Sequence, residues 1–193
     1  MLELNRISAG YGKQTVLDGI SVDFEKGKLT SIIGVNGCGK STLLKAILGI
    51  LSLSSGEIFI DGENLLTISR NEIAKKIAYL SQGKNIPDMT VEQMVLHGRF
   101  PYLSYPRRYS SHDREVAIKA MEIVGVAEFA HKPLYSLSGG MRQNAYIAMA
   151  LAQDTDYILL DEPTTYLDIA HQLELMRLLK QLSDNGKGIV TVM

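Results

Sequence analysis

The chain has 193 residues, enough to bury one core or a core with an inserted lobe, and its 46% hydrophobic and 21% charged residues exclude a disordered chain. Lys and Arg total 20 against 21 Asp and Glu, and the net charge of −1 offers no basic excess for nucleic acid or an anionic membrane surface. The single cysteine, Cys38, excludes an intrachain disulfide and favours a reducing compartment.

The N-terminus does not have the pattern of a targeting sequence. Residues 1–6 contain no basic segment followed by a long apolar run, so no signal peptide is predicted. No stretch approaches the roughly 20 apolar residues that a membrane-spanning helix needs. We therefore expect a soluble protein whose membrane role, if it has one, comes through a partner.

Short apolar runs bounded by Gly and Asp predict an α/β fold. Two runs that alternate in polarity, at 2–7 and 20–24, predict an antiparallel edge layer. Five later runs are also predicted as strands, at residues 29–33, 58–60, 77–80, 157–160 and 189–192. The first and the last two of these are almost continuously apolar, which is typical of parallel strands that helices cover on both faces.

Helical patterns separate these runs. Residues 41–48 are predicted as a helix after the first buried run, and Ser69 and Thr90 begin two segments with capping-box spacing. From residue 87 to residue 153 no strand pattern occurs, and apolar residues recur at helical spacing. We therefore predict a helical subdomain at 87–153, inserted into a core formed by residues 1–86 and 154–193.

Residues 34–42 match the phosphate-binding pattern G-x-x-x-x-G-K-[ST] between a predicted strand and a predicted helix. Glycines let successive backbone N–H groups point at an anion, and the helix N-terminus adds partial positive charge. Lys40 can reach the terminal phosphates of a nucleotide, and the Ser41 hydroxyl can ligate Mg²⁺. The alternative is a glycine turn that precedes Lys-Ser by chance. The predicted nucleotide contacts are Gly34, Asn36, Gly37, Cys38, Gly39, Lys40, Ser41 and Thr42.

Two adjacent acids end the apolar run at 157–160. Because ligands gather at the carboxyl ends of parallel strands, Asp161 is predicted to hold Mg²⁺, directly or through water, and Glu162 to polarise a water toward the γ-phosphate. The alternative is that these acids only end a strand with soluble residues. Gln82 follows the run at 77–80 and could touch both metal and water, or could be a solvated loop residue.

The sequence Leu-Ser-Gly-Gly-Met-Arg-Gln at residues 137–143 begins another predicted helix. Taken with the phosphate loop, Gln82 and the acids at 161–162, it resembles the signature of ABC transporter ATPases, in order and spacing, over essentially the whole chain. The family signature usually has Gln where this chain has Met141, a change that we expect to be tolerated. The resemblance implies a P-loop NTPase (RecA-like) core with a mostly parallel sheet, an N-terminal antiparallel β layer and an inserted helical subdomain.

The same resemblance assigns roles to five further residues. It implies that Ser138, Gly139 and Gly140 face the γ-phosphate held by a second copy, so that two chains close head to tail around two ATP molecules; the alternative is a plain helix cap. Tyr11 is implied to stack on adenine, or is an exposed turn tyrosine. Asp168 is implied to be the acid of a loop that crosses the dimer interface, and could equally cap a helix.

Two segments, 98–102 and 163–172, resemble the ATPases of iron–siderophore, haem and vitamin B12 importers. That branch implies hydrolysis of ATP with Mg²⁺ at the cytoplasmic face of the cell membrane. It also implies two transmembrane permease subunits and, indirectly, an extracellular binding protein. No nucleic-acid partner is expected, because the insertions usual in the DNA- and ribosome-acting relatives are not found.

The family continues beyond its last strand with a switch histidine, whereas this chain ends at Met193. We therefore expect a C-terminally truncated chain. This leaves open the alternative of an ATP-binding module without efficient turnover. The four histidines show no metal-ligand spacing, and His171 is predicted to be a surface residue on a helix.

Overall fold

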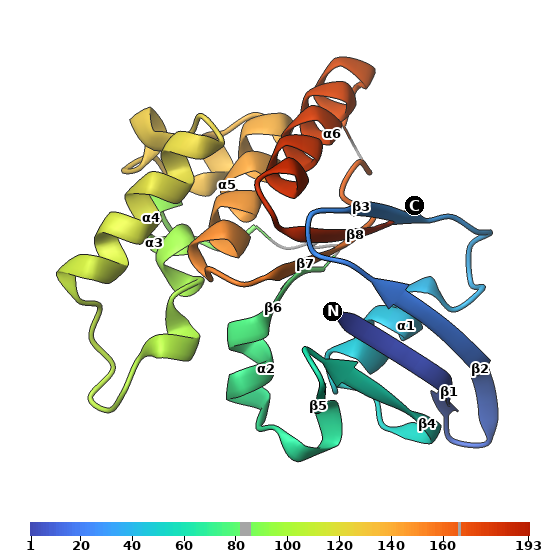
Figure 1. Ribbon diagram of the computed structural model, residues 1–193. Helices are drawn as coiled ribbons and strands as arrows, with labels where there is room; N and C mark the ends of the chain where they lie inside the picture. The colour runs from blue at the N-terminus through green and yellow to red at the C-terminus, as the bar shows by residue number, and fades with distance from the viewer. Residues whose placement is uncertain (82–85, 166) are drawn as a thin grey trace.

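The computed structural model describes residues 1–81, 86–165 and 167–193 (Figure 1). The described residues contain two four-stranded sheets, and helix α1 (Lys40–Ile47) packs on strands of both. Helices α3, α4 and α5 gather at one side of the sheets, and α6 covers the parallel sheet (Figure 1). The predicted α/β fold, with an antiparallel layer and a parallel sheet, is confirmed.

The first sheet is antiparallel and has the order β2-β1-β4-β5. Its strands are β1 (Leu2–Tyr11), β2 (Gln14–Phe24), β4 (Leu53–Ile60) and β5 (Glu63–Asn64). Leu2 pairs with Phe24 on one side and with Ile60 on the other, and all three side chains are buried. Strand β2 begins at Gln14 rather than at residue 20 because its polar first residues pair with the end of β1 across a tight turn.

The second sheet is parallel and has the order β3-β8-β7-β6. Its strands are β3 (Leu29–Ile32), β6 (Ile77–Leu80), β7 (Tyr157–Asp161) and β8 (Gly188–Val192). Every residue of β7 and β8 is buried, as predicted for central parallel strands. The strand predicted at 29–33 is confirmed as β3, but the expectation that it is buried on both faces was wrong. Strand β3 is only partly buried, because it lies at the sheet edge and pairs with β8 alone among the described strands.

Alternation along the central strands divides the core into two apolar clusters. Leu159 of β7 and Val190 of β8 face the cluster that contains α1 and the antiparallel sheet. Ile158 faces the opposite cluster, where α3, α4, α5 and α6 (Ile169–Asp184) supply most of the contacts. The parallel sheet is therefore covered on both faces, and its strand ends are the parts left open to a ligand.

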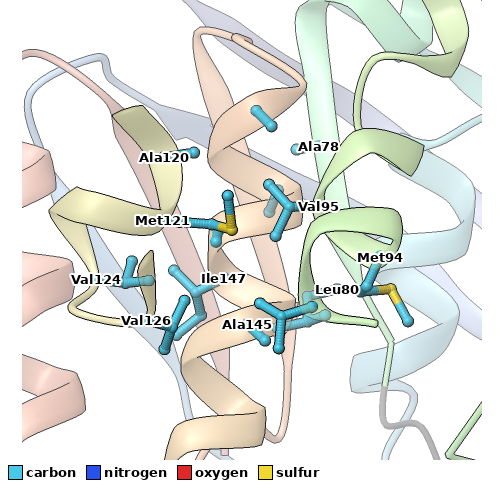
Figure 2. Packing of buried hydrophobic residues seen from close by; sticks show 14 of the residues in the cluster. Ala78, Leu80, Met94, Val95, Ala120, Met121, Val124, Val126, Ala145 and Ile147 are labelled. Atoms are coloured by element: carbon cyan, nitrogen blue, oxygen red, sulfur yellow. The ribbon is translucent and has the colours of Figure 1, made fainter. Parts of the chain in front are cut away.

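Between β6 and β7 the described residues form helices and short 3₁₀ turns. They are α3 (Val91–His97), η2 (Phe100–Tyr102), α4 (Ser111–Ile123), η3 (Ala127–Phe129), η4 (Leu134–Ser136) and α5 (Gly139–Ala152). Val95 of α3, Met121 of α4 and Ile147 of α5 meet in one apolar cluster (Figure 2). This is the segment in which the helical lobe was expected, although the division into a core and a subdomain stays a prediction.

Among the described residues, capping boxes begin three helices. Ser69 precedes α2 (Arg70–Lys76), which follows the 3₁₀ turn η1 (Leu65–Thr67), and Thr90 precedes α3, so both predicted boxes are confirmed. A third box, with Ser110 as the cap, begins α4 and was not noticed in the sequence. None of the helices in the described part of the chain has the length and apolarity needed to cross a bilayer.

Candidate nucleotide-binding site

The loop after β3 curls back on itself before α1 begins. Gly37 and Gly39 have positive φ angles of 83° and 101°, and Gly39 is the N-cap of α1. Residues with a Cβ adopt these angles only at a cost, so the glycines allow the curl that the phosphate-loop pattern predicts. The loop therefore presents backbone N–H groups and a helix N-terminus on its inner side.

Lys40, the first residue of α1, is buried and its ammonium group lies inside this loop. Its Nζ donates to the carbonyl oxygen of Gly34 at 2.7 Å and to that of Val35 at 3.1 Å. These two bonds link the start of the loop to its end, and they hold the Lys40 ammonium group on the inner side of the loop. A lysine in this place can neutralise the terminal phosphates of a nucleotide.

A carboxylate from β7 joins the phosphate loop to the parallel sheet. Ser41 Oγ donates to Asp161 Oδ1 at 3.0 Å, and the hydroxyl of Tyr79, on the neighbouring strand β6, donates to Asp161 Oδ2 at 3.2 Å. Burial and the negative charge of Asp161 raise the pKa of Tyr79 to about 12, so the phenol keeps its proton at neutral pH. Hydroxyl and carboxylate oxygens are the ligands that Mg²⁺ prefers, and Mg²⁺ usually takes only one or two carboxylates from protein.

Glu162 directly follows Asp161 and has an unusual backbone conformation. Its φ of 49° is in the left-handed region, and its N–H donates to the carbonyl oxygen of Val192 at 3.0 Å. Thr165 Oγ1 donates to Glu162 Oε2 at 3.1 Å. A strained, cross-braced residue at the end of a buried strand is a common feature of functional sites.

Residues from three parts of the chain line a cleft of about 330 Å³ at this strand end. The lining residues are Tyr11, Val16, Asn36, Gly37, Gly39, Lys40, Ser41, Thr42 and Glu162. Tyr11 ends β1, is half exposed, and has Lys45 Nζ 6.0 Å from its ring centroid. The cleft therefore combines an aromatic ring, the phosphate loop and an acid, as a nucleotide site requires.

Two predicted contacts of the phosphate loop lie outside this lining. Gly34 touches the site through its carbonyl oxygen, which accepts the bond from Lys40. Cys38 is exposed, and its sulfur is packed so closely that a Cβ on Gly34 would lie 2.7 Å from it. Gln82, predicted to touch metal and water, lies outside the described residues. Among the described residues, no group of three or more His, Cys, Asp or Glu side chains could hold a metal by itself.

The residues implied to face a second copy form a separate group. Ser138 is the N-cap of α5 and accepts a bond from the N–H of Met141, and Asp168 is the N-cap of α6, as one of its alternatives predicted. His171, in the first turn of α6, joins them: its Nδ1 lies 2.8 Å from Asp168 Oδ2. The expectation of a plain surface histidine was incomplete, because the ring also packs against Gly140 of α5.

Sequence reasoning missed three residues of these groups. Val16 lines the cleft and packs on Gly39, where a Cβ would lie 2.9 Å from Val16 Cγ1. Tyr79 could be found only with the order of the strands in hand, since it bonds to an acid on the neighbouring strand. For His171, the spacing of three residues from Asp168 was the available signal, because it places a side chain over an N-cap.

Comparison with known proteins gives one family match and relatives that span nearly the whole chain. The profile described as ABC transporter matches residues 17–165. The chain is 42% identical over 192 residues to the petrobactin import ATP-binding protein FpuD of Bacillus anthracis, a match covering 99% of this chain and 70% of that protein. It is 43% identical over 193 residues to the iron(3+)-hydroxamate import ATP-binding protein FhuC of Bacillus subtilis (strain 168), covering 99% of this chain and 72% of that protein.

The fold is also similar to that of a solved, dimeric bacterial ABC transporter cassette. The TM-score is 0.83 at 30% identity, and the match covers 100% of this chain and 88% of the other. The predicted P-loop NTPase fold is therefore confirmed.

Proposed function

The chain belongs to the ABC transporter family of ATPases, and from this premise we propose that it powers import of an iron–siderophore, haem or cobalamin, with Mg²⁺ as its metal. The family match and the relatives support an ATP-binding subunit of an importer. The names of the two relatives, which refer to petrobactin and to iron(3+)-hydroxamate, favour the siderophore among these three cargoes.

The observation that carries the proposal is the 3.0 Å bond between Ser41 and Asp161. It joins the phosphate loop to the end of β7, so that a nucleotide on the loop has its terminal phosphates beside the acids. Lys40 would pair with those phosphates, and the N–H groups around Gly37 and Gly39 would bind their oxygens. Tyr11 would stack on the adenine.

The donor set of this strand end fits Mg²⁺. Ser41 and Asp161 would hold the ion, together with Gln82, which is also proposed as a ligand. When bound, Mg²⁺ would neutralise charge that develops on the transferred phosphoryl group. Glu162 would accept a proton from the attacking water, and the bond from Thr165 would keep its carboxylate oriented for this step.

For this chain, association with a second copy, with a permease and, indirectly, with a binding protein is a proposal. We propose that two copies close head to tail, with Ser138, Gly139, Gly140 and Asp168 of one facing the nucleotide on the other. The solved cassette of similar fold is dimeric, which supports the pairing of two copies. Transmembrane permease subunits would then hold the protein at the cytoplasmic face of the membrane, and the helical segment 87–153 would act as a subdomain that moves with nucleotide state.

A binding and turnover experiment tests the proposal. The chain should bind a fluorescent ATP analogue saturably in Mg²⁺ and release phosphate from ATP, and Lys40→Ala should abolish both. Lys119→Ala, an exposed lysine on α4, is the matched control and should behave as wild type. Unchanged turnover in Lys40→Ala would contradict the assignment of the loop, whereas binding without phosphate release would favour the alternative of an ATP-binding module.

The cargo needs a separate experiment. Membrane vesicles that contain the chain with its co-purified permease, with the binding protein supplied on the opposite side, should take up a ferric siderophore only when Mg-ATP is supplied on the cytoplasmic side. Haem and cobalamin supplied in parallel distinguish the three cargoes. Absence of ATP-dependent uptake for all three would contradict the importer branch while leaving the ATPase assignment intact.

A further inference from the structure

The segment that follows Glu162 is fastened to the first turn of α6 by several side chains. Gln172 Nε2 donates to the carbonyl oxygen of Leu167 at 2.9 Å, and Asp168 accepts the N–H of His171 at 2.9 Å. Thr165 Oγ1, in turn, donates to Glu162 Oε2. The acid of this segment, Asp168, is therefore held in one orientation by α6.

His171 uses its ring as well as its backbone to hold Asp168. The ring Nδ1 lies 2.8 Å from Asp168 Oδ2, while the backbone N–H of the same histidine donates to Oδ1. Because an ionised carboxylate only accepts hydrogen bonds, Nδ1 carries the proton and donates. Bonds from the backbone and then from the side chain of His171 lower the pKa of Asp168, so it stays ionised at neutral pH.

The other edge of the same ring lies against α5. A Cβ built on Gly140 would lie 2.2 Å from His171 Cδ2 and 2.8 Å from Nε2, closer than real atoms approach. Gly140 is the second residue of α5, two positions after the N-cap Ser138. The ring therefore fills the place that any larger residue at position 140 would need, and it touches the α5 N-terminus while bonded to Asp168.

We infer that His171 is a positioning residue, which ties Asp168 to the first turn of α5 so that both segments meet a second copy's nucleotide in a fixed relation. This rests on the proposed function, in which the two segments face that nucleotide. A histidine that only capped Asp168 would contact one element, whereas this ring contacts Asp168 with its Nδ1 and α5 with its Cδ2 edge. A small displacement of groups that meet a reacting phosphate costs rate more than it costs binding.

Two substitutions separate the two contacts of the ring. In His171→Phe, a ring still packs on Gly140 but cannot bond to Asp168 Oδ2, while the backbone N–H still donates to Oδ1. In His171→Asn, the amide nitrogen can replace Nδ1 beside Asp168, but no ring reaches Gly140. Glu174→Ala, an exposed residue of the same helix, is the control. ATPase rate, nucleotide affinity and thermal unfolding temperature are measured for the full chain, alone or with its permease, whichever shows turnover in wild type.

We expect kcat to fall about tenfold in both His171 variants. The dissociation constant for a fluorescent ATP analogue should stay within about twofold of wild type, because the phosphate loop is untouched. If either variant keeps its wild-type kcat, the two-contact coupling is overturned. It is equally overturned if kcat, affinity and thermal unfolding temperature fall together, since that pattern shows only a structural role. Failure of the wild-type chain to bind Mg-ATP would instead contradict the proposed function.

Discussion

The hydroxyl of Tyr79 donates to Asp161 across two neighbouring strands, at 3.2 Å from Oδ2. Ser41 Oγ donates to the other carboxylate oxygen, Oδ1, at 3.0 Å. Both oxygens of the buried acid are therefore held, one from the phosphate loop and one from β6. The plane of the carboxylate is fixed by these two donors, so its orientation toward a metal depends on Tyr79 as much as on Ser41.

The first prediction is that Tyr79→Phe raises the Mg²⁺ concentration needed for ATP binding without lowering the affinity for nucleotide in the absence of the metal. The substitution removes one oxygen and leaves Asp161 free to turn about its bond to Ser41. We expect the Mg²⁺ concentration for half-maximal ATP binding to rise about fivefold, while affinity in EDTA stays unchanged. Fluorescent-nucleotide titrations check both values. Tyr109→Phe, a partly buried tyrosine of the helical segment, is the control, and an unaltered Mg²⁺ requirement in Tyr79→Phe would contradict the role.

The second prediction concerns Glu162. If it takes the proton of the attacking water, Glu162→Gln should lower phosphate release by at least about 100-fold, because an amide cannot accept that proton. ATP binding should be retained, since the phosphate loop is intact. Single-turnover phosphate release and nucleotide titration measure the two effects, with Glu174→Gln on α6 as control. Turnover close to wild type would remove Glu162 from the role of base.

The third prediction is a pH dependence of stability from the buried pair of Arg99 and Asp113. Arg99 Nε donates to Asp113 Oδ1 at 2.9 Å, and both side chains are buried. Burial alone would raise the pKa of Asp113, but hydrogen bonds from Ser110 and the charge of Arg99 outweigh it and lower the pKa to about 2. Because this is below the unfolded value of 3.8, the stabilisation is complete above about pH 4 and is lost as pH falls toward 2.

Asp113→Asn should therefore destabilise the protein by about 3 kcal/mol at pH 7, since it leaves a buried guanidinium without its counter-charge. The difference from wild type should shrink as pH falls from 4 to 2, because the wild-type carboxyl then takes up its proton. Urea unfolding over this range measures it, and Glu115→Gln on α4 is the exposed control. A difference that does not change with pH would show that the ion pair contributes nothing through its charge.

The elements of the fold could be predicted where the sequence pattern reflects burial on both faces or a local hydrogen bond. The runs at 77–80 and 157–160 and the caps at Ser69 and Thr90 are of this kind. For the run at 29–33, the prediction of burial on both faces was wrong, because its apolar residues do not indicate that β3 lies at a sheet edge. Strand order depends on pairing between residues far apart in the chain. A single sequence has no periodic pattern that indicates such pairing, so the order could not be predicted.

The site could be predicted only in part for the same reason. The phosphate loop and the acid pair that contains Glu162 are each a short, continuous sequence motif. The structure places residues of both around one cleft. Val16 and Tyr79 reach the site across a sheet or between strands, so their roles follow from the register rather than from spacing. The contact of His171 with Gly140 joins two helices and could not be read from either helix alone.

The fourth prediction tests whether Tyr11 recognises the base. Its half-exposed ring lines the cleft beside Lys40 and Ser41, so removal of the ring in Tyr11→Ala should raise the dissociation constant for ATP about tenfold. Tyr11→Phe keeps the stacking face and should bind within about twofold of wild type. Competition by inorganic triphosphate, which has no base, should be the same in all three proteins. An equal loss for triphosphate would mean that Tyr11 supports the loop rather than the adenine, and no loss for ATP would exclude stacking.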